Sequence, residues 1–381
     1  MLHRTDIPKK NEKKKSRRAF LKLAGYGTLG LMATGLRPFT EPLFAASPKA
    51  SAQKTGFIPD LDLSLTAEAG RASILPGSPT GVWRYETQVH SGESSRLLTL
   101  PDSYLGPIIK VNSGDKIRIR FANKLPQESI VHWHGLHVPD DMDGPPRHAV
   151  APGSSYLYEF TVNNRAGTYW YHPHPHGITG PQVYGGLAGL FLVSDDEERA
   201  AGLPDGSFDI PLVIQDRTFD RDNQLVYMSG HPMERMIGFL GDRILVNGKP
   251  DYTLPVSTGA YRLRLLNGSN SRIYKLAWKD GRPMTVIATD GGLLEAPVHR
   301  RYVFLAPGER IELWADFSSD PIGYETALVS LPFDAGAAGG GGMGRGMMRG
   351  RRNPGRLRLP NGAPFSICTI QVNQKMRESR R

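Results

Sequence analysis

Histidine spacing is the feature of this chain that most restricts its structure. Two short strings carry five of its 11 histidines, His132-Trp133-His134-Gly135 and His172-Pro173-His174-Pro175-His176-Gly177. Alternate residues of a β-strand point to the same face, so imidazoles at positions i and i+2 project toward one point. Two such strands side by side would present four neutral nitrogen ligands, which suit copper, zinc, iron or nickel. We therefore predict a metal site on a pair of β-strands rather than incidental structural histidines.

Alternation of apolar and polar residues extends beyond the histidines and predicts an all-β fold. Residues 116–121 read Lys-Ile-Arg-Ile-Arg-Phe, which places their apolar side chains on one face of a strand. Segments 156–160 and 187–193 continue this pattern. The chain also holds 43 glycines and 30 prolines, a composition that suits a turn-rich β protein better than a helical one.

A weak internal repeat indicates that one folding unit occurs twice. Segment 111–123 is similar to segment 256–267, and each is followed downstream by an Ala-Pro-Gly turn, at residues 151–153 and 306–308. The second copy has no counterpart of either histidine string. We therefore assign the metal chemistry to the first copy and a scaffold role to the second.

The repeat predicts two tandem β-sandwich domains, at residues 57–197 and 205–375. A short helix or turn near residues 195–201 would mark the boundary between them. Within the second domain, residues 335–358 form a low-complexity stretch rich in glycine, arginine and methionine. We predict a disordered loop there, although its methionines are soft ligands that suit Cu(I).

The net charge of +10 does not describe the body of the chain. Residues 1–54 hold 12 Lys and Arg against 3 Asp and Glu, and residues 343–381 hold 10 against 1, so the body itself is mildly acidic. We therefore expect no nucleic-acid partner. The one cysteine, Cys368, excludes an intrachain disulfide, and its alternating strand context predicts a buried, unreactive thiol.

The first 52 residues are typical of an export signal. Residues 16–22 read Ser-Arg-Arg-Ala-Phe-Leu-Lys, a twin-arginine motif, and small residues offer cleavage sites after Ala46 or Ala52. The apolar run 23–33 is too short for a membrane span, so we expect no stable membrane insertion. This signal predicts export of a folded protein to the periplasm.

The histidine strings resemble those of the multicopper oxidase family, closest to the bacterial cuprous oxidases, with laccases and bilirubin oxidases nearby. The segments that carry the resemblance are 131–136, 168–177 and Gly186-Leu187-Ala188-Gly189, and it extends over residues 57–375. It implies cupredoxin-like Greek-key β-sandwiches and a trinuclear copper cluster that reduces O2 to water. By motif, His132 would bind the type 2 copper, and His134, His172 and His174 the type 3 pair.

The resemblance also implies roles for two neighbouring residues. Asp143, nine positions after His134, resembles the family's carboxylate that helps to deliver protons to oxygen, although its sequence context also suits a turn. His176 is expected to be a neighbour and not a ligand, because the family's histidine pair directly follows the aromatic run.

The chain departs from the family pattern after the second domain. A third domain normally supplies four more trinuclear histidines and a type 1 copper bound by a cysteine flanked by histidines, and residues up to Arg381 contain no such motif. We therefore expect an oxidase-type protein, for Cu(I) or phenolic substrates and O2, that is incomplete alone. Either the chain is a fragment or the product of a broken gene, or a third domain on another chain completes the site. The alternative is a non-enzymatic exported copper-binding or cell-envelope structural protein on the same scaffold.

Overall fold

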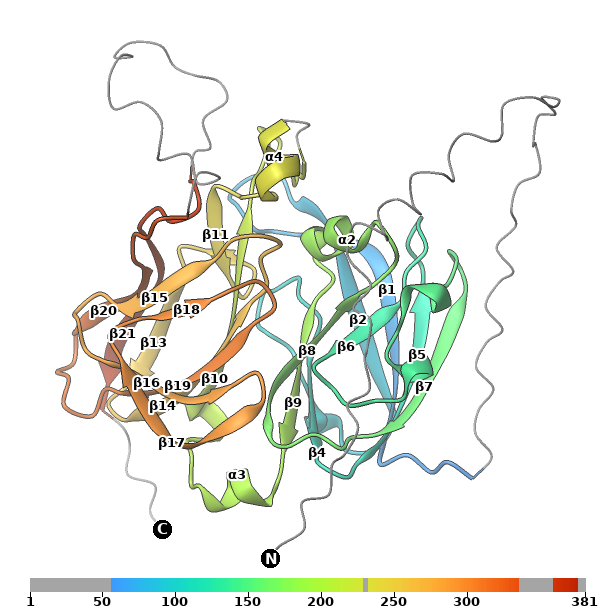
Figure 1. The fold of residues 1–381 in the computed structure, drawn as a ribbon, viewed down its shortest axis with the longest axis horizontal. Coiled ribbons are helices and arrows are strands. Elements are labelled where there is room, and N and C mark those ends of the chain that lie inside the picture. Colours follow the sequence, from blue (N-terminus) through green and yellow to red (C-terminus); the bar gives the residue numbers. More distant parts are fainter. Residues whose placement is uncertain (1–55, 229–231, 336–358, 376–381) are drawn as a thin grey trace, which may run out of the picture. The chain divides into compact units, whose positions relative to one another are not determined.

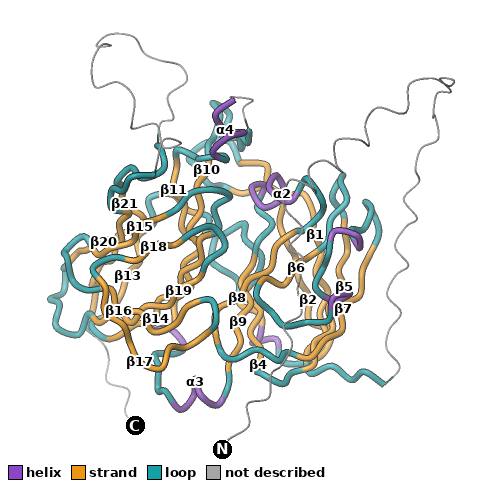
Figure 2. The backbone as a smooth tube through the Cα atoms, viewed as in Figure 1, coloured by secondary structure: helices purple, strands orange, loops and turns teal. Residues whose placement is uncertain are grey.

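The computed structural model describes residues 56–228, 232–335 and 359–375 (Figure 1). The predicted export signal, and the predicted low-complexity loop apart from Ala335, lie outside the described residues. Strands dominate the described chain, as Figure 2 shows, which confirms the all-β prediction. Its α-helices are short: α2 (Thr179–Gly185), α3 (Asp196–Ala200) and α4 (Pro232–Ile237).

The first half of the described chain contributes two sheets that enclose one core. Its strands are β1 (Leu61–Ala72), β2 (Thr80–Ser91), β3 (Leu97–Leu98), β4 (Ile108–Asn112), β5 (Lys116–Asn123), β6 (Val131–His134), β7 (Ser155–Thr161), β8 (Gly167–Pro173) and β9 (Gly189–Ser194). One sheet has the order β2-β1-β5-β7 and the other β3-β4-β9-β8-β6. Their inner faces bury apolar side chains such as Ile119, Phe121 and Trp133 in a single cluster, the arrangement of a β-sandwich.

The second half contributes two further sheets around a second core. Its strands are β10 (Asp209–Arg217), β11 (Arg243–Val246), β12 (Lys249–Pro250), β13 (Thr253–Ser257), β14 (Ala260–Asn267), β15 (Tyr274–Trp278), β16 (Met284–Thr289), β17 (Gly292–Arg300), β18 (Val303–Leu305), β19 (Arg310–Asp316), β20 (Glu325–Ser330) and β21 (Phe365–Gln374). The sheet orders are β12-β11-β10-β14-β19-β16-β17 and β13-β21-β20-β15-β18. Cys368, on β21, is 2% exposed within this core, as the sequence predicts.

Strand pairing in the two halves follows the sequence repeat. In the first half β5 lies parallel to β1 and antiparallel to β7, and in the second half β14 lies parallel to β10 and antiparallel to β19. A buried arginine–glutamate pair joins equivalent strands in each copy, Arg118 to Glu159 and Arg264 to Glu312. The repeat therefore extends to the hydrogen-bond register, while the proposed boundaries at 57–197 and 205–375 stay a prediction.

The predicted segments match the elements closely, with one difference. Segments 116–121 and 156–160 lie in β5 and β7, and the predicted helix near 195–201 is α3. The predicted strand segment 187–193 begins two residues before the observed strand, because β9 starts at Gly189. Leu187 instead donates its backbone N–H to the carbonyl of Gln182 after a left-handed glycine, so it ends helix α2.

A third apolar cluster joins the halves along the outer face of the β8 sheet. It packs Trp170 and Leu190 of the first half against Val213 and Leu266 of the second. All seven residues of β8 are buried, because one face meets the first core and the other meets the second half. Among the described residues, none of the helices has the length and apolar character that crossing a membrane requires.

Candidate metal centre

Strands β6 and β8 bring the two histidine strings together. They pair antiparallel, with His132 opposite His172 and His134 opposite Trp170. Beyond the end of β8, His174 donates its backbone N–H to the carbonyl of Ile130 at 2.9 Å, which extends the pairing by one more position. The predicted pair of adjacent strands is therefore present.

Alternation sorts the side chains of these strands by face. Trp133 and Tyr171 point into the first core and are fully buried, while the histidines between them occupy the opposite face. On that face the His132 ring centroid lies 5.6 Å from that of His134, 5.2 Å from that of His172 and 5.1 Å from that of His174. The four predicted ligands thus form one cluster.

Three of these histidines already have ligand-like geometry. The nitrogens of His132, His134 and His172 lie within 4.8 Å of one another. Nδ1 of His134 is 3.2 Å from Nε2 of His172, close to the spacing of about 3.3 Å that two imidazoles adopt on one tetrahedral ion. His174 borders this group, and its Nδ1 is buried without a hydrogen-bond partner, which bound metal would relieve. His176 is exposed and outside the group.

Backbone carbonyls fix the tautomers of two ligands. His172 donates from Nδ1 to its neighbour Pro173 O at 2.8 Å, and His132 donates from Nδ1 to Asp143 O at 2.9 Å. Because a carbonyl only accepts, the proton of each ring sits on Nδ1, and Nε2 carries the lone pair that can bind a metal. This arrangement orients imidazoles for a metal in many proteins. In this structure Nε2 of His172 faces Nδ1 of His134 at 3.2 Å.

Asp143 reaches the cluster through His132. Its Oδ1 lies 3.2 Å from Nδ1 of His132, and its side chain is 41% exposed. Burial raises the pKa of Asp143, although the nearby imidazoles of His132 and His174 act in the opposite direction. Gly144 permits this approach, because at its positive φ a Cβ would collide with the carbonyl of Val131.

Burial lowers the pKa of three imidazoles of the cluster, those of His134, His172 and His174. It lowers the pKa of His134 to about 4, with a smaller contribution from the positive charge of Arg310. Burial likewise lowers the pKa of His172 well below its usual value and that of His174 to a lesser extent. Because metal ions bind the deprotonated imidazole, the site is ready for a ligand at neutral pH.

Trp170 and Arg310 also border the histidine cluster, although neither was predicted as a site residue from the sequence. The Trp170 ring lies 4.2 Å from the His172 ring and 5.1 Å from the His134 ring, and its Nε1 is buried without a partner. Trp170 is two residues before His172 and therefore lies on the same face of the strand, so the spacing could have predicted this contact. Arg310 comes from the second half, and no local pattern indicates its approach.

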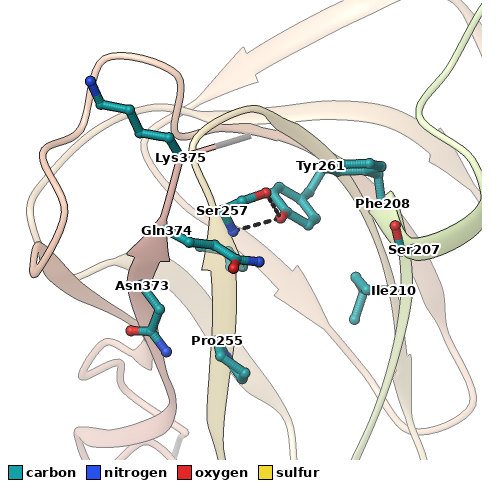
Figure 3. Close-up of a pocket in the computed structure, with 10 residues that line it drawn as sticks. Ser207, Phe208, Ile210, Pro255, Ser257, Tyr261, Asn373, Gln374 and Lys375 are labelled. Carbon is teal, nitrogen blue, oxygen red and sulfur yellow. Dashed lines mark hydrogen bonds between the residues drawn. The ribbon is translucent and has the colours of Figure 1, made fainter. Parts of the chain in front are cut away.

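The donor set fits a soft or borderline metal such as copper. All four predicted ligands are neutral imidazoles, which suit copper, zinc, iron and nickel, whereas calcium and magnesium prefer oxygen. The second half also holds an open pocket of about 730 Å³, lined by Phe208, Ser257, Tyr261 and Lys375 among others (Figure 3). The Tyr261 hydroxyl is already hydrogen-bonded to Ser257, and no histidine lines that pocket, so the candidate chemistry belongs to the cluster.

Comparisons with known proteins agree with this site. Residues 82–198 match a family model described as multicopper oxidase, a span that includes all four histidines. A multicopper oxidase of Staphylococcus aureus is 38% identical over 233 residues, which cover 61% of this chain and 51% of the relative. The cell division protein FtsP of Escherichia coli is 37% identical over 259 residues, which cover 68% of this chain and 51% of the relative.

Solved structures extend the similarity to the second half. The crystal structure of the McoA multicopper oxidase from Aquifex aeolicus has a TM-score of 0.69 and 34% identity, over 85% of this chain and 64% of that one. The two sandwiches are thus cupredoxin-like, as the resemblance implies. The chain spans about half the length of the two curated relatives. Residues 82–198 therefore form a multicopper oxidase family domain, and the chain is similar to members of that family in sequence and fold.

Proposed function

We propose that the histidine cluster binds copper as the first-domain part of an oxidase-type trinuclear site. His132 would bind the type 2 copper, and His134, His172 and His174 would bind the type 3 pair. The observation that carries the proposal is the group of three imidazoles whose nitrogens lie within 4.8 Å of one another, inside a matched multicopper oxidase domain. Bound copper would supply the electron transfer to O2, with Cu(I) or a phenol as the donor.

The chain's own groups would orient the ligands and hold a proton. The carbonyls of Pro173 and Asp143 hold the protons of His172 and His132 on Nδ1, so Nε2 of each ring carries the lone pair that can bind a metal. Reduction of O2 to two waters consumes four electrons and four protons, so the site needs a nearby acid. Burial raises the pKa of Asp143, which makes this carboxyl a better proton carrier than an ordinary aspartate, and it lies beside His132, where it could pass a proton toward the cluster.

Turnover would require more ligands than the four imidazoles that the proposal assigns to the described residues. The proposal assigns four imidazoles to this chain, whereas Cys368 lies in the second core, flanked by Ile367 and Thr369 and not by histidines. The remaining ligands and the type 1 copper would come from a further segment or a partner chain. We therefore expect copper binding without sustained oxidation from the chain as given.

Copper titration combined with oxygen uptake tests both parts of this proposal. The metal-free chain is titrated with Cu(I) and Cu(II) against a chelator of known affinity, and oxygen consumption is then followed with Cu(I) or 2,6-dimethoxyphenol as donor. We expect tight copper binding and no sustained oxygen uptake. Absence of copper binding after reconstitution would contradict the site assignment, and robust turnover would contradict the incompleteness.

The alternative function is a structural role in the cell envelope. The similarity to FtsP, whose name describes a cell division protein, favours it. Retention of four clustered imidazoles favours copper binding instead, since a purely structural protein has no need to keep them. We further propose that the chain reaches the periplasm through the twin-arginine motif at residues 16–22. Metal analysis of protein isolated from the periplasm would separate the two functions.

A further inference from the structure

The two Ala-Pro-Gly turns of the internal repeat have nearly the same backbone structure. Gly153 donates its N–H to the carbonyl of Asn123 at 2.7 Å, and Gly308 donates its N–H to the carbonyl of Asn267 at 2.9 Å. Their φ angles are +76° and +82°, in the left-handed region that favours glycine. The turns are therefore equivalent as local structures, and a difference between them reflects their surroundings.

Their surroundings differ sharply. A Cβ built on Gly153 would meet no atom within 4 Å. A Cβ built on Gly308 would lie 3.3 Å from Cε1 of His134 and 3.7 Å from Cζ2 of Trp170. The turn of the second half thus lies against the edge of a predicted metal ligand, while its counterpart in the first half faces open space.

Arg310 ties this turn to the histidine strands. It is 5% exposed, donates from Nε to the carbonyl of Thr168 on β8 at 2.9 Å, and donates from Nη1 to the carbonyl of Gly308 at 3.0 Å. Asp290 pairs with its guanidinium at 3.0 Å and holds it in place. The side chain therefore spans β8, the turn and the body of the second half.

The same guanidinium borders the residue that follows His134. A Cβ on Gly135 would lie 2.8 Å from Nη2 of Arg310, so only glycine fits beside it. Asn164 holds that turn from the first half, because it donates from Nδ2 to the carbonyl of Gly135 at 2.9 Å. His134 is therefore bounded by Trp170, by the turn at Gly308 and by the backbone beside Arg310.

We propose that the turn at residues 306–310 is a positioning wall that fixes the His134 imidazole for metal binding. The second half then contributes directly to a site whose four assigned imidazole ligands lie in the first half. This inference rests on the proposed function in one respect, because it takes His134 to be a metal ligand. The contact between the turn at residues 306–310 and the His134 ring is a property of the chain itself and can be measured without metal.

Matched glycine substitutions test the wall. Gly308→Ala and Gly153→Ala add the same methyl group at the same φ in equivalent turns, and they differ only in what the methyl group meets. We expect both variants to lose similar thermal stability. We expect only Gly308→Ala to weaken Cu(II) affinity, by about tenfold, as changes around metal ligands typically do, and to alter the electron paramagnetic resonance spectrum of bound Cu(II). Equal affinity and identical spectra for the two variants would overturn the proposal.

Histidine NMR on the metal-free chain separates this inference from the copper proposal. With the His134 imidazole resonances assigned through His134→Gln, Gly308→Ala should shift them and Gly153→Ala should leave them unchanged. A wild-type chain that binds no copper would overturn the proposed function, while the NMR comparison would still decide whether the wall positions His134. Unshifted His134 resonances in Gly308→Ala would overturn the wall.

Arg310 variants cover the case in which Gly308→Ala fails to fold. Arg310→Lys keeps the positive charge but has no planar set of donors for the carbonyls of Thr168 and Gly308. Arg310→Met loses both the positive charge and the hydrogen-bond donors. We expect both variants to shift the His134 resonances, with Met causing the larger effect. Unchanged His134 resonances in Arg310→Met would contradict the proposal, because the turn would then hold the His134 ring in place without Arg310.

Discussion

Proton placement on single imidazoles determines what the cluster can bind. His172 and His132 each donate a hydrogen bond from Nδ1 to a backbone carbonyl, so the lone pair of each ring is on Nε2. A cluster of neutral rings tolerates close contact because no like charges oppose it. Trp170, stacked on His172, adds an apolar cover that favours the neutral state further.

Removal of ligands should abolish copper binding and leave the fold intact. His132→Gln, or His172→Gln combined with His174→Gln, is expected to lower copper affinity by at least about tenfold. The histidines lie on the sheet face opposite the first core, so the loss should change thermal melting little. His176→Gln, in the same string but exposed and outside the group, is the matched control. A double variant that unfolds while wild-type copper content is retained would show that these histidines are structural.

At the scale of elements, helix α3 is fixed to the end of β9 by its N-terminal cap. The side chain of Asp195 accepts a hydrogen bond from the N–H of Glu198 at 2.8 Å and another from the N–H of Ala166 at 2.7 Å. Burial alone would raise the pKa of Asp195, but these backbone donors outweigh it and the pKa is lowered. The cap thus connects the helix to the chain just before β8.

Loss of this cap should destabilise the protein in a pH-dependent way. Asp195→Ala is expected to cost about 1 kcal/mol of unfolding free energy near pH 7. Because the folded pKa lies below the unfolded one, the charged cap stabilises above the unfolded pKa, and its contribution fades as pH falls toward the folded pKa. The gap between wild type and Asp195→Asn in urea unfolding should therefore narrow below about pH 4. A gap that is constant from pH 7 to pH 3 would rule out the charged cap.

At the scale of the whole molecule, a buried charge network joins the two halves. Arg264 on β14 pairs with Glu312 at 3.0 Å and with Glu198 of α3 at 3.1 Å, and it contacts Thr168 of β8 at 3.2 Å. Its side chain is 3% exposed. The network therefore fixes the second half to the strand that carries His172, in addition to the apolar cluster around Trp170.

Breaking this network should lower the free energy of unfolding much more than breaking a more exposed ion pair. Arg264→Met would remove the arginine that pairs with Asp209 and leave Glu312 and Glu198 with Arg262 as their arginine partner, so it is expected to cost about 3 kcal/mol. The control is Arg282→Met, whose side chain is 25% exposed beside Asp280 and Asp320, with an expected cost of about 1 kcal/mol or less. Urea unfolding at fixed pH measures both. Similar costs for the two variants would mean that the network adds no stability of its own.

The sequence predicts local features of this molecule well and contacts between its halves poorly. Alternation places His132 and His134 on one face, and Cys368 in a buried strand, because each depends only on the period of a strand. The approach of Gly308 and Arg310 to His134 depends on how two sandwiches pack, which no periodicity encodes. Even the repeat could not reveal it, because Gly153 and Gly308 share a turn and differ only in their neighbours.

The proposed export of the chain can be tested independently of its fold. Arg17 and Arg18 form the twin-arginine pair, and a receptor that reads their planar donors should not accept lysine in their place. Arg17→Lys combined with Arg18→Lys keeps the charge, so we expect the folded precursor to stay in the cytoplasm with residues 1–46 or 1–52 attached. Cell fractionation and N-terminal sequencing of wild type and variant measure this. Normal export and processing of the variant would indicate the general secretory route, and the prediction that the chain is exported already folded would then lose its basis.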